Sequence, residues 1–286
     1  MSDRLHIENI GFPVPDAQSY MNLGLRVAEE GETILTPVGT YLFWSPSKGI
    51  EVWVKVAAEG EKTFLHGHFK GKSRIEVAIV DKKEYESNAL AEGFFVAYPE
   101  PVKGQGFLNQ NVNHQYGDGT YSSSYTPFLF DAPDYDKYAE IPLPFLAEVQ
   151  LTAFPFLMQS FETEDDWINW QLEKELFAPD ENGNRPYMGG EAFGPDALTY
   201  QRKDKDDYPK ATAFMAGRIL ETAILTNEET GEDFCWAKVL TTVGELDVVA
   251  APDILDGPIV RFGILTCHAQ LSGRILNIPE LNLSLE

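Results

Sequence analysis

The residues best suited to chemistry are two histidines in one short segment, His66-Gly-His68. If this segment is extended, both imidazoles lie on the same side, because side chains alternate along a strand. Imidazole and carboxylate ligands suit zinc or iron, and Glu51 and Glu76 are the nearest candidate acids. The alternative is two loop histidines without a metal. Because no third histidine follows at ligand spacing, we expect no cofactor, with a divalent metal on His66, His68, Glu51 or Glu76 as the alternative.

Other catalytic patterns do not occur in the sequence. It contains no Gly-x-Ser-x-Gly elbow, no phosphate-binding Gly-x-x-x-x-Gly-Lys loop and no His-Glu-x-x-His motif. Cys267 and His268 are neighbours in sequence, so on a strand their side chains diverge and cannot form a thiolate–imidazole pair. We therefore assign no catalytic residues, and the sequence favours a protein that is not an enzyme over the enzyme alternative given below.

The charge of the chain limits its partners. Its 286 residues carry 45 acidic and 22 basic side chains, a net charge of −23. Such a surface repels nucleic acids and anionic lipids, so we expect a protein or small-molecule partner, with homo-oligomerisation as an open alternative. The N-terminus has no hydrophobic signal segment and no apolar run is long enough for a membrane helix, which indicates a cytoplasmic protein. Cys235 and Cys267 are expected to be buried, reduced thiols.

The most probable binding surface combines a polar loop with an aromatic strand residue. Residues 104–125 are rich in Gly, Asn, Gln, Ser and Tyr, and a loop of this length is usually functional or mobile. Non-catalytic binding by this loop and by the cleft between the two parts of the chain is the predicted function. The candidate contact residues are Phe107, Tyr116, Tyr121, Tyr125 and Trp53.

The pattern of the first 177 residues predicts a mixed α+β region. Residues 50–56 alternate cleanly, with Ile50, Val52 and Val54 on one face and Glu51 and Trp53 on the other. Helices are expected at 17–23, capped by Asp16, over 81–92, and after Thr163, whose hydroxyl can cap the acidic first turn. Strands are expected at 5–14, 23–27, 33–35, 41–44, 73–80, 94–98, 127–130 and 146–154.

The last 76 residues predict a small closed β-barrel of the OB type. Five strands are expected at 212–226, 233–241, 245–251, 259–270 and 271–278. Identical Gly-Arg-Ile-Leu segments, 217–220 and 273–276, lie in the first and last strands, which meet when such a barrel closes. The predicted organisation is an N-terminal domain at 1–177, a linker at 178–210 and an OB-like domain at 211–286. The predicted fold class is α+β, mainly β.

The N-terminal pattern Ile7-Glu-Asn-Ile-Gly-Phe-Pro-Val-Pro-Asp16, with a short helix and Leu23-Gly-Leu-Arg-Val27, resembles vicinal-oxygen-chelate (glyoxalase-like) modules. This resemblance implies a metal held by a first-strand histidine and a last-strand glutamate. Asn9 stands at the histidine position here, and Glu51 matches the acid loosely. The enzyme alternative is a divergent metal-dependent lyase or dioxygenase of this type, using His66, His68, Glu51 or Glu76.

The C-terminal pattern carries two further implications. OB barrels often bind single-stranded nucleic acid, a second alternative that the acidic composition disfavours. Arg218 and Arg274 could form an anion site, but salt bridges to nearby acids are the favoured interpretation. The arrangement Thr226-Asn-x-x-Thr-Gly-x-x-Phe-x-Trp236, with Asp247-Val-Val-Ala250, also resembles an uncharacterised family of bacterial proteins. That resemblance implies a bacterial cytoplasmic protein and no particular activity.

Overall fold

The computed structural model describes residues 6–56, 64–85, 92–99, 127–196 and 210–279. Strands dominate these residues, as predicted, and the described part of the chain has two α-helices, α1 (Ala17–Glu30) and α2 (Glu164–Glu173). The strands form a four-stranded sheet and a ten-stranded sheet. The first is called the small sheet below and the second the ring sheet.

The small sheet contains four antiparallel strands in chain order: β1 (Glu32–Leu35), β2 (Thr40–Trp44), β3 (Ile50–Val56) and β4 (Leu65–Phe69). On β3 the predicted alternation is confirmed, because Ile50, Val52 and Val54 join the apolar cluster that also holds Leu23 and Val27 of α1. Glu51 and Trp53 are buried on the opposite face. The small sheet therefore has two covered faces, one apolar and one partly polar.

The ring sheet takes strands from most of the remaining chain. Its order is β11-β12-β8-β5-β6-β7-β14-β10-β9, with β13 paired to β8 and with further β11–β10 and β8–β14 pairings. Its strands are β5 (Ile75–Glu84), β6 (Gly93–Pro99), β7 (Phe128–Asp131), β8 (Phe145–Phe161), β9 (Ala192–Pro195), β10 (Thr212–Thr226), β11 (Asp233–Thr241), β12 (Gly244–Ala250), β13 (Leu255–Asp256) and β14 (Ile264–Asn277).

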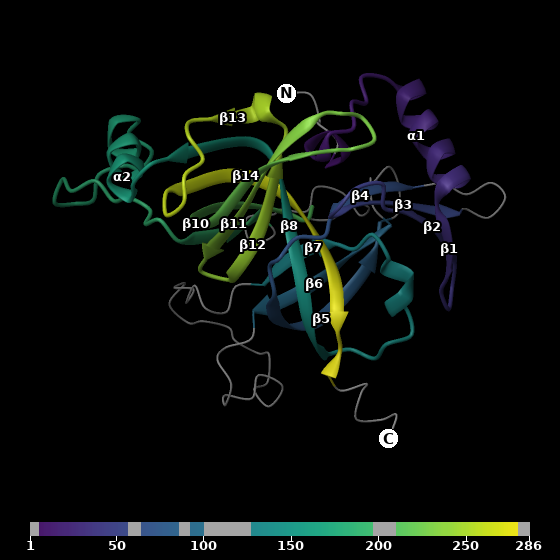
Figure 1. The fold of residues 1–286 in the computed structure, drawn as a ribbon. Helices are drawn as coiled ribbons and strands as arrows, with labels where there is room; N and C mark the ends of the chain where they lie inside the picture. Colours follow the sequence, from purple (N-terminus) through teal and green to yellow (C-terminus); the bar gives the residue numbers. More distant parts are fainter. Residues whose placement is uncertain (1–5, 57–63, 86–91, 100–126, 197–209, 280–286) are drawn as a thin grey trace.

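Two closed circuits of strand pairing follow from this order. One runs β8-β5-β6-β7-β14 and the other β8-β12-β11-β10-β14, and each closes through the long β8–β14 pair. These two strands run side by side through the centre of the molecule (Figure 1). The ring sheet therefore takes strands from both sides of the predicted linker at 178–210, and β9 lies within that range.

The shared strands are buried on both faces. Val149 and Leu151 of β8 and Leu271 of β14 belong to the largest apolar cluster of the molecule. The alternate positions point the other way, toward the small sheet, and many of them are polar. They are Gln150 and Thr152 on β8 and Gln270, Ser272 and Arg274 on β14.

Both predicted helix caps are confirmed. Asp16 accepts a hydrogen bond from the backbone N–H of Ser19, and Thr163 and Asp166 form a capping box. However, α1 does not end near Leu23, because burial of Val27 one turn later continues its apolar face to Glu30. The strands predicted at 5–14 and 23–27 are therefore wrong: a 3-10 helix, η1 (His6–Ile10), and α1 occupy these positions.

The helix predicted over 81–92 is wrong at its start. Asp81 to Glu84 continue β5, because they pair with β6 after a bulge between Ile79 and Asp81. The residues that follow, 86–91, lie outside the described part of the chain.

Of the five strands predicted within 211–286, the first three are found, as β10, β11 and β12, but the last two are not separate strands. The ranges 259–270 and 271–278 contribute to one strand, β14, and β8 from upstream completes the circuit. β10 pairs with the 264–270 part of β14, within the range of the predicted fourth strand, whereas 271–277, within the range of the predicted last strand, pairs with β8. The two Gly-Arg-Ile-Leu segments do not face each other, since Gly217 pairs with Leu265 and Gly273 with Leu151.

Two smaller predictions concern thiols and membranes. Cys235 and Cys267 are buried and free, as predicted, and burial raises the pKa of the Cys267 thiol to about 12. No helix among the described residues is long and apolar enough to cross a membrane.

Close packing explains the glycine of the second tetrapeptide and leads to a stability prediction. A Cβ on Gly273 would lie 2.4 Å from Phe130 Cδ2 and 2.9 Å from Leu151 Cδ2. We expect Gly273→Ala to lower the free energy of unfolding by about 1–3 kcal/mol, because the core must shift to admit the methyl group. Urea denaturation measures the change.

The matched control is Gly194→Ala on β9, where the nearest atom to a new Cβ lies 4.0 Å away. This variant should stay within about 0.5 kcal/mol of the parent protein. Equal stability of both variants would contradict the packing argument.

Candidate functional site between the two sheets

Four of the sequence-predicted site residues lie together on one face of the small sheet. Glu51 is paired with His68 and Trp53 with His66 across β3 and β4, so all four side chains share a face. All four are buried, and they contact the polar positions of the ring sheet. Glu76 lies on β5, where it is exposed and paired with Glu148, so it does not join them.

Ser272 of β14 connects the two histidines. Its Oγ lies 2.9 Å from His66 Nε2 and 2.9 Å from His68 Nδ1. His6 of η1 packs edge-on against His66, with ring centroids 5.2 Å apart, and stacks on Phe154 at 4.7 Å. The polar contacts between the sheets are thus enclosed on this side by aromatic rings.

The direction of the hydrogen bonds follows from Thr152. This hydroxyl donates to the backbone carbonyl of Phe69 at 2.6 Å, so its oxygen accepts from Gln150 Nε2 at 2.8 Å. The amide oxygen of Gln150 therefore faces His68 Nε2 at 2.7 Å, which must carry the proton. His68 Nδ1 then accepts from Ser272, and Ser272 accepts from His66 Nε2–H.

The chain of hydrogen bonds ends at the buried carboxylate of Asp247 on β12. Its Oδ1 accepts from Trp236 Nε1 at 2.8 Å and from the Lys72 N–H at 3.0 Å. Its Oδ2 accepts from the Ser73 N–H at 2.8 Å and from Gln150 Nε2 at 2.9 Å. Four N–H donors satisfy both oxygens, so this anion is stable without contact with water.

Burial keeps the inner histidine neutral. The pKa of His68 is lowered to about 3, first by desolvation and then by the positive charge of Arg274. Desolvation likewise lowers the pKa of His6 to about 4. His68 is therefore a fixed donor and acceptor at neutral pH, and it cannot serve there as a general base.

The polar side chains between the small sheet and the ring sheet are called the polar layer below. Trp53 lies among ion pairs at the end of this layer opposite Asp247. The Arg274 guanidinium carbon lies 4.5 Å from the centre of its ring, and Lys137 Nζ lies 4.9 Å from it. Trp53 Nε1 donates to Glu51 Oε2 at 3.1 Å, and Arg274 pairs with the same carboxylate. Arg274 and Lys137 also pair with Asp134, each at 3.2 Å.

The salt bridges predicted for Arg274 and Arg218 are confirmed. Arg274 pairs with Glu51 and Asp134, and Arg218 pairs with Glu164 and Glu191.

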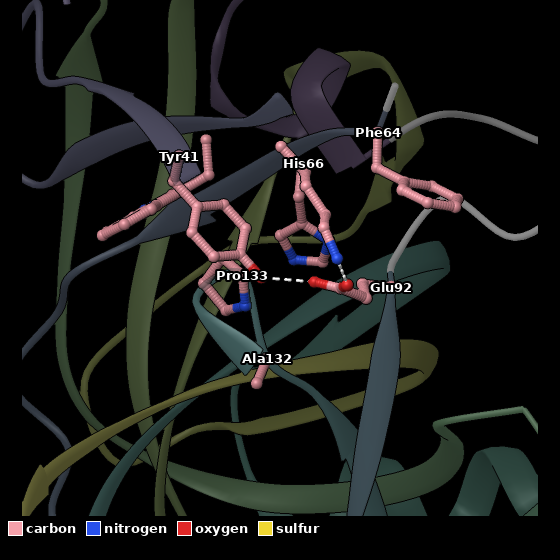
Figure 2. A pocket seen from close by; sticks show the side chains of 8 residues that line it. Tyr41, Phe64, His66, Glu92, Ala132 and Pro133 are labelled. Carbon is pink, nitrogen blue, oxygen red and sulfur yellow. Dashed lines mark hydrogen bonds and ion pairs between the residues drawn. The ribbon is translucent and has the colours of Figure 1, made fainter. Parts of the chain in front are cut away.

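A small cavity opens beside Trp53 at the seam between the sheets (Figure 2). Its volume is about 10 Å³, near the room that one water molecule needs. Three aromatic side chains and His66 line it from the small-sheet side, and Glu92, Ala132 and Pro133 line it from the ring-sheet side. The aromatic residues are Tyr41, Trp53 and Phe64, and Lys55 completes the lining.

The Glu92 carboxylate is the main charged group of the cavity. It accepts a hydrogen bond from the Tyr41 hydroxyl and pairs with the ammonium of Lys55, as the dashed lines in Figure 2 show. Lys55 Nζ also lies 3.1 Å from Asp136 Oδ2, and the Asp136 N–H donates to the Tyr41 hydroxyl at 3.2 Å. Burial raises the pKa of Tyr41, so its hydroxyl stays protonated and donates to Glu92.

The other predicted binding residues cannot be placed. Phe107, Tyr116, Tyr121 and Tyr125 lie outside the described part of the chain. The described neighbours of that range, Pro99 and Phe128, lie at the opposite end of the β6–β7 pair from Ala132 and Glu92, as the strand register requires.

The described residues do not form the cluster of ligands that the metal hypothesis requires. Within the described ranges, no group of three or more His, Cys, Asp or Glu side chains is placed to hold a metal ion. Both nitrogens of His68 are engaged by Ser272 and Gln150, and Glu51 is engaged by Arg274 and Trp53. Asn9, at the position of the expected histidine ligand, donates to the Pro155 carbonyl and accepts from the Ala251 N–H.

Sequence reasoning missed the ring-sheet half of the site. Ser272, Gln150 and Asp247 are distant in sequence from His68, and each follows an apolar residue on a strand that carries further polar residues. Polar residues at alternate positions of a strand were the available signal. The strand also had to have two buried faces, which its sequence does not reveal.

Comparison of the chain with protein-family models, with curated proteins and with solved structures finds no match in any of the three. The resemblances to vicinal-oxygen-chelate modules, to OB barrels and to a bacterial family stay predictions.

The Asp247 carboxylate gives a direct test of the polar layer. We expect Asp247→Ala to lower the free energy of unfolding by about 3–5 kcal/mol, because four N–H groups lose their acceptor. Asp247→Asn should fall between this variant and the parent, since it keeps one carbonyl oxygen. Urea denaturation compares them with Glu181→Gln, which removes an exposed charge and should change stability by less than about 0.5 kcal/mol. A loss near that of the control in Asp247→Ala would contradict the assignment.

The neutral state of His68 predicts a pH dependence. Its pKa is near 6.5 in the unfolded chain and about 3 in the folded protein, so the unfolded state binds protons first on acidification. The contribution of His68 is complete above pH 6.5 and is lost progressively as the pH falls toward 3. We expect His68→Gln, which is neutral throughout, to show a shallower fall of unfolding free energy between pH 6.5 and 4. Equal slopes in the two proteins would refute a neutral, buried His68.

Proposed function

We propose that this chain is a non-catalytic binding protein, and that it binds a small polar ligand in the cavity between the small sheet and the ring sheet. The main observation in support of this proposal is the composition of that cavity. Three aromatic side chains line it beside the carboxylate of Glu92, which is paired with Lys55. Apolar walls with a few placed polar groups are typical of small-molecule sites. Trp53, which the sequence already indicated as a binding residue, belongs to this wall.

The charge arrangement supports ligand binding over a purely structural role. Lys55 and Glu92 keep 20% and 10% of their side-chain surface exposed, whereas Asp134 is fully buried. Solvent therefore reaches the pair that lines the cavity, as it also reaches Lys137, which keeps 29% of its side-chain surface exposed. A ligand can exchange with this pair without breaking the fully buried contacts of Asp247 or Ser272.

Because the cavity is small, a lining side chain must move before a ligand can enter. A space of about 10 Å³ admits no organic ligand unless a lining group moves. Phe64, Lys55 and Glu92 are the partly exposed members of the lining, and β-sheet packing holds Tyr41 and Trp53 in place. Movement of Phe64 or Lys55 would open the site while the sheets stay fixed.

A matched pair of phenylalanine variants tests this proposal. The probes are methylammonium, propylammonium, propanol, acetamide, acetate and propionate, titrated against the protein while the Trp53 indole N–H resonance is followed by NMR. At least one probe should saturate this signal. Phe64→Leu should weaken that binding about fivefold, because an aromatic contact is worth about 1 kcal/mol.

The control is Phe177→Leu, in the exposed segment after α2 and away from the cavity lining. It should leave the dissociation constant unchanged. Failure of all six probes to saturate the signal would refute the proposed site, as would equal effects of the two substitutions.

A further inference from the structure

We infer that the ligand of this cavity presents an ammonium group, and that Lys55 occupies the place of that group in the described structure. This inference rests on the proposed function and names the chemical class of its ligand. It follows from the partners of Lys55, from the aromatic walls and from the charge balance of the site.

The partners of Lys55 are those that a ligand cation requires. Its Nζ pairs with Glu92 and lies 3.1 Å from Asp136 Oδ2. The Tyr41 hydroxyl donates to the same Glu92 carboxylate and thereby fixes its position. Two carboxylates held in this way form a preorganised site for a cation that carries N–H donors.

The aromatic walls favour the same class. Tyr41, Trp53 and Phe64 line the cavity together with Glu92. The faces of aromatic rings attract cations, and a cage of such rings beside a carboxylate is a common way to bind an ammonium group. An anionic ligand would meet Glu92 directly and be repelled by it, and a neutral ligand would form neither an ion pair with Glu92 nor a cation–π contact with the rings.

Charge balance points in the same direction. The ion pairs around the cavity join four carboxylates to three cations, which leaves one excess negative charge among these described residues. The carboxylates are Glu51, Glu92, Asp134 and Asp136, and the cations are Lys55, Lys137 and Arg274. A ligand that brings a positive charge is electrostatically favoured over one that brings none.

Exchange of Lys55 for a ligand is also sterically reasonable. Lys55 stands near the end of β3 and keeps 20% of its side chain exposed, so its long stem can turn toward solvent. Its departure frees a volume shaped like an alkylammonium chain. The ligand's ammonium would then restore the bonds to Glu92 and Asp136, so the exchange costs few interactions.

Removal of the lysine tests this inference. The variant is Lys55→Ala, and the probes are propylammonium, propanol and propionate, which share a chain length and differ in charge. Lys55→Ala should bind propylammonium at least tenfold more tightly than the parent protein does. It should bind propanol and propionate at least tenfold more weakly than propylammonium, and Glu92→Gln in the same background should remove the preference.

The matched control is Lys83→Ala, which removes an exposed lysine from β5. It should leave propylammonium binding as in the parent. Tighter binding of propanol or propionate than of propylammonium would overturn the inference, and so would an equal affinity of the Lys55→Ala variant and the parent for propylammonium.

Two outcomes separate this inference from the proposed function. Saturable binding of propanol or propionate that Phe64→Leu weakens would keep the site and reject the ammonium class. No saturable binding by any probe would reject both. If Lys55→Ala does not fold, the same ranking of the three probes must hold in the parent protein, and a different ranking there rejects the inference.

Discussion

The buried carboxylate of Asp247 is the point on which the packing of several separate segments depends. It gathers N–H donors from the segment between β4 and β5, from β8 and from β11 around one strand of the ring sheet. Its hydrogen bond with Gln150 sets the orientation of that amide, and the amide in turn sets the tautomer of His68. Because an unpaired charge in this position would be costly, the two sheets can pack closely only in the register that completes these bonds. Gly71 shows how close this packing is, since a Cβ there would lie within 2.1–2.3 Å of the Asp247 carboxyl atoms.

The polar layer changes in character from one end to the other. Near Asp247 and Ser272 it is fully buried and every described hydrogen bond has a fixed direction. Near Trp53 it becomes a network of ion pairs, and at Lys55 and Glu92 it reaches partial exposure. A rigid interior thus supports a lining whose outermost groups can move. This gradient is the arrangement expected for a binding site, which needs accurately placed groups and one replaceable contact.

Local sequence signals predicted those parts of the fold that depend on local interactions. The caps at Asp16 and Thr163, the alternation over 50–56 and the common side of His66 and His68 follow from helix and strand geometry alone, and all are found. The strand predicted at 5–14 and the helix predicted over 81–92 failed because tertiary packing decided them. Three of the five predicted C-terminal strands are found, whereas the last two are one strand, β14, and the circuit is completed by β8, which the local sequence of 211–286 cannot indicate. In the site, the spacing of His66 and His68 predicted that the two side chains lie together. Ser272 lies 206 residues from His66, so sequence spacing could not indicate that these two residues are in contact.

The sharing of β8 and β14 by both circuits has a consequence for how the chain acquires its structure. Residues paired in β8 and β14 are separated by more than a hundred positions, as in the pair Glu148 and Asn277. Contacts between residues this far apart in sequence slow folding, because a long loop must close before the contacts contribute any stabilising free energy. During synthesis neither circuit can close until β14 has left the ribosome, so strands β5 to β8 would wait with an open edge. Unpaired strand edges invite association with other chains, and this interval is therefore when the protein depends most on protection from aggregation.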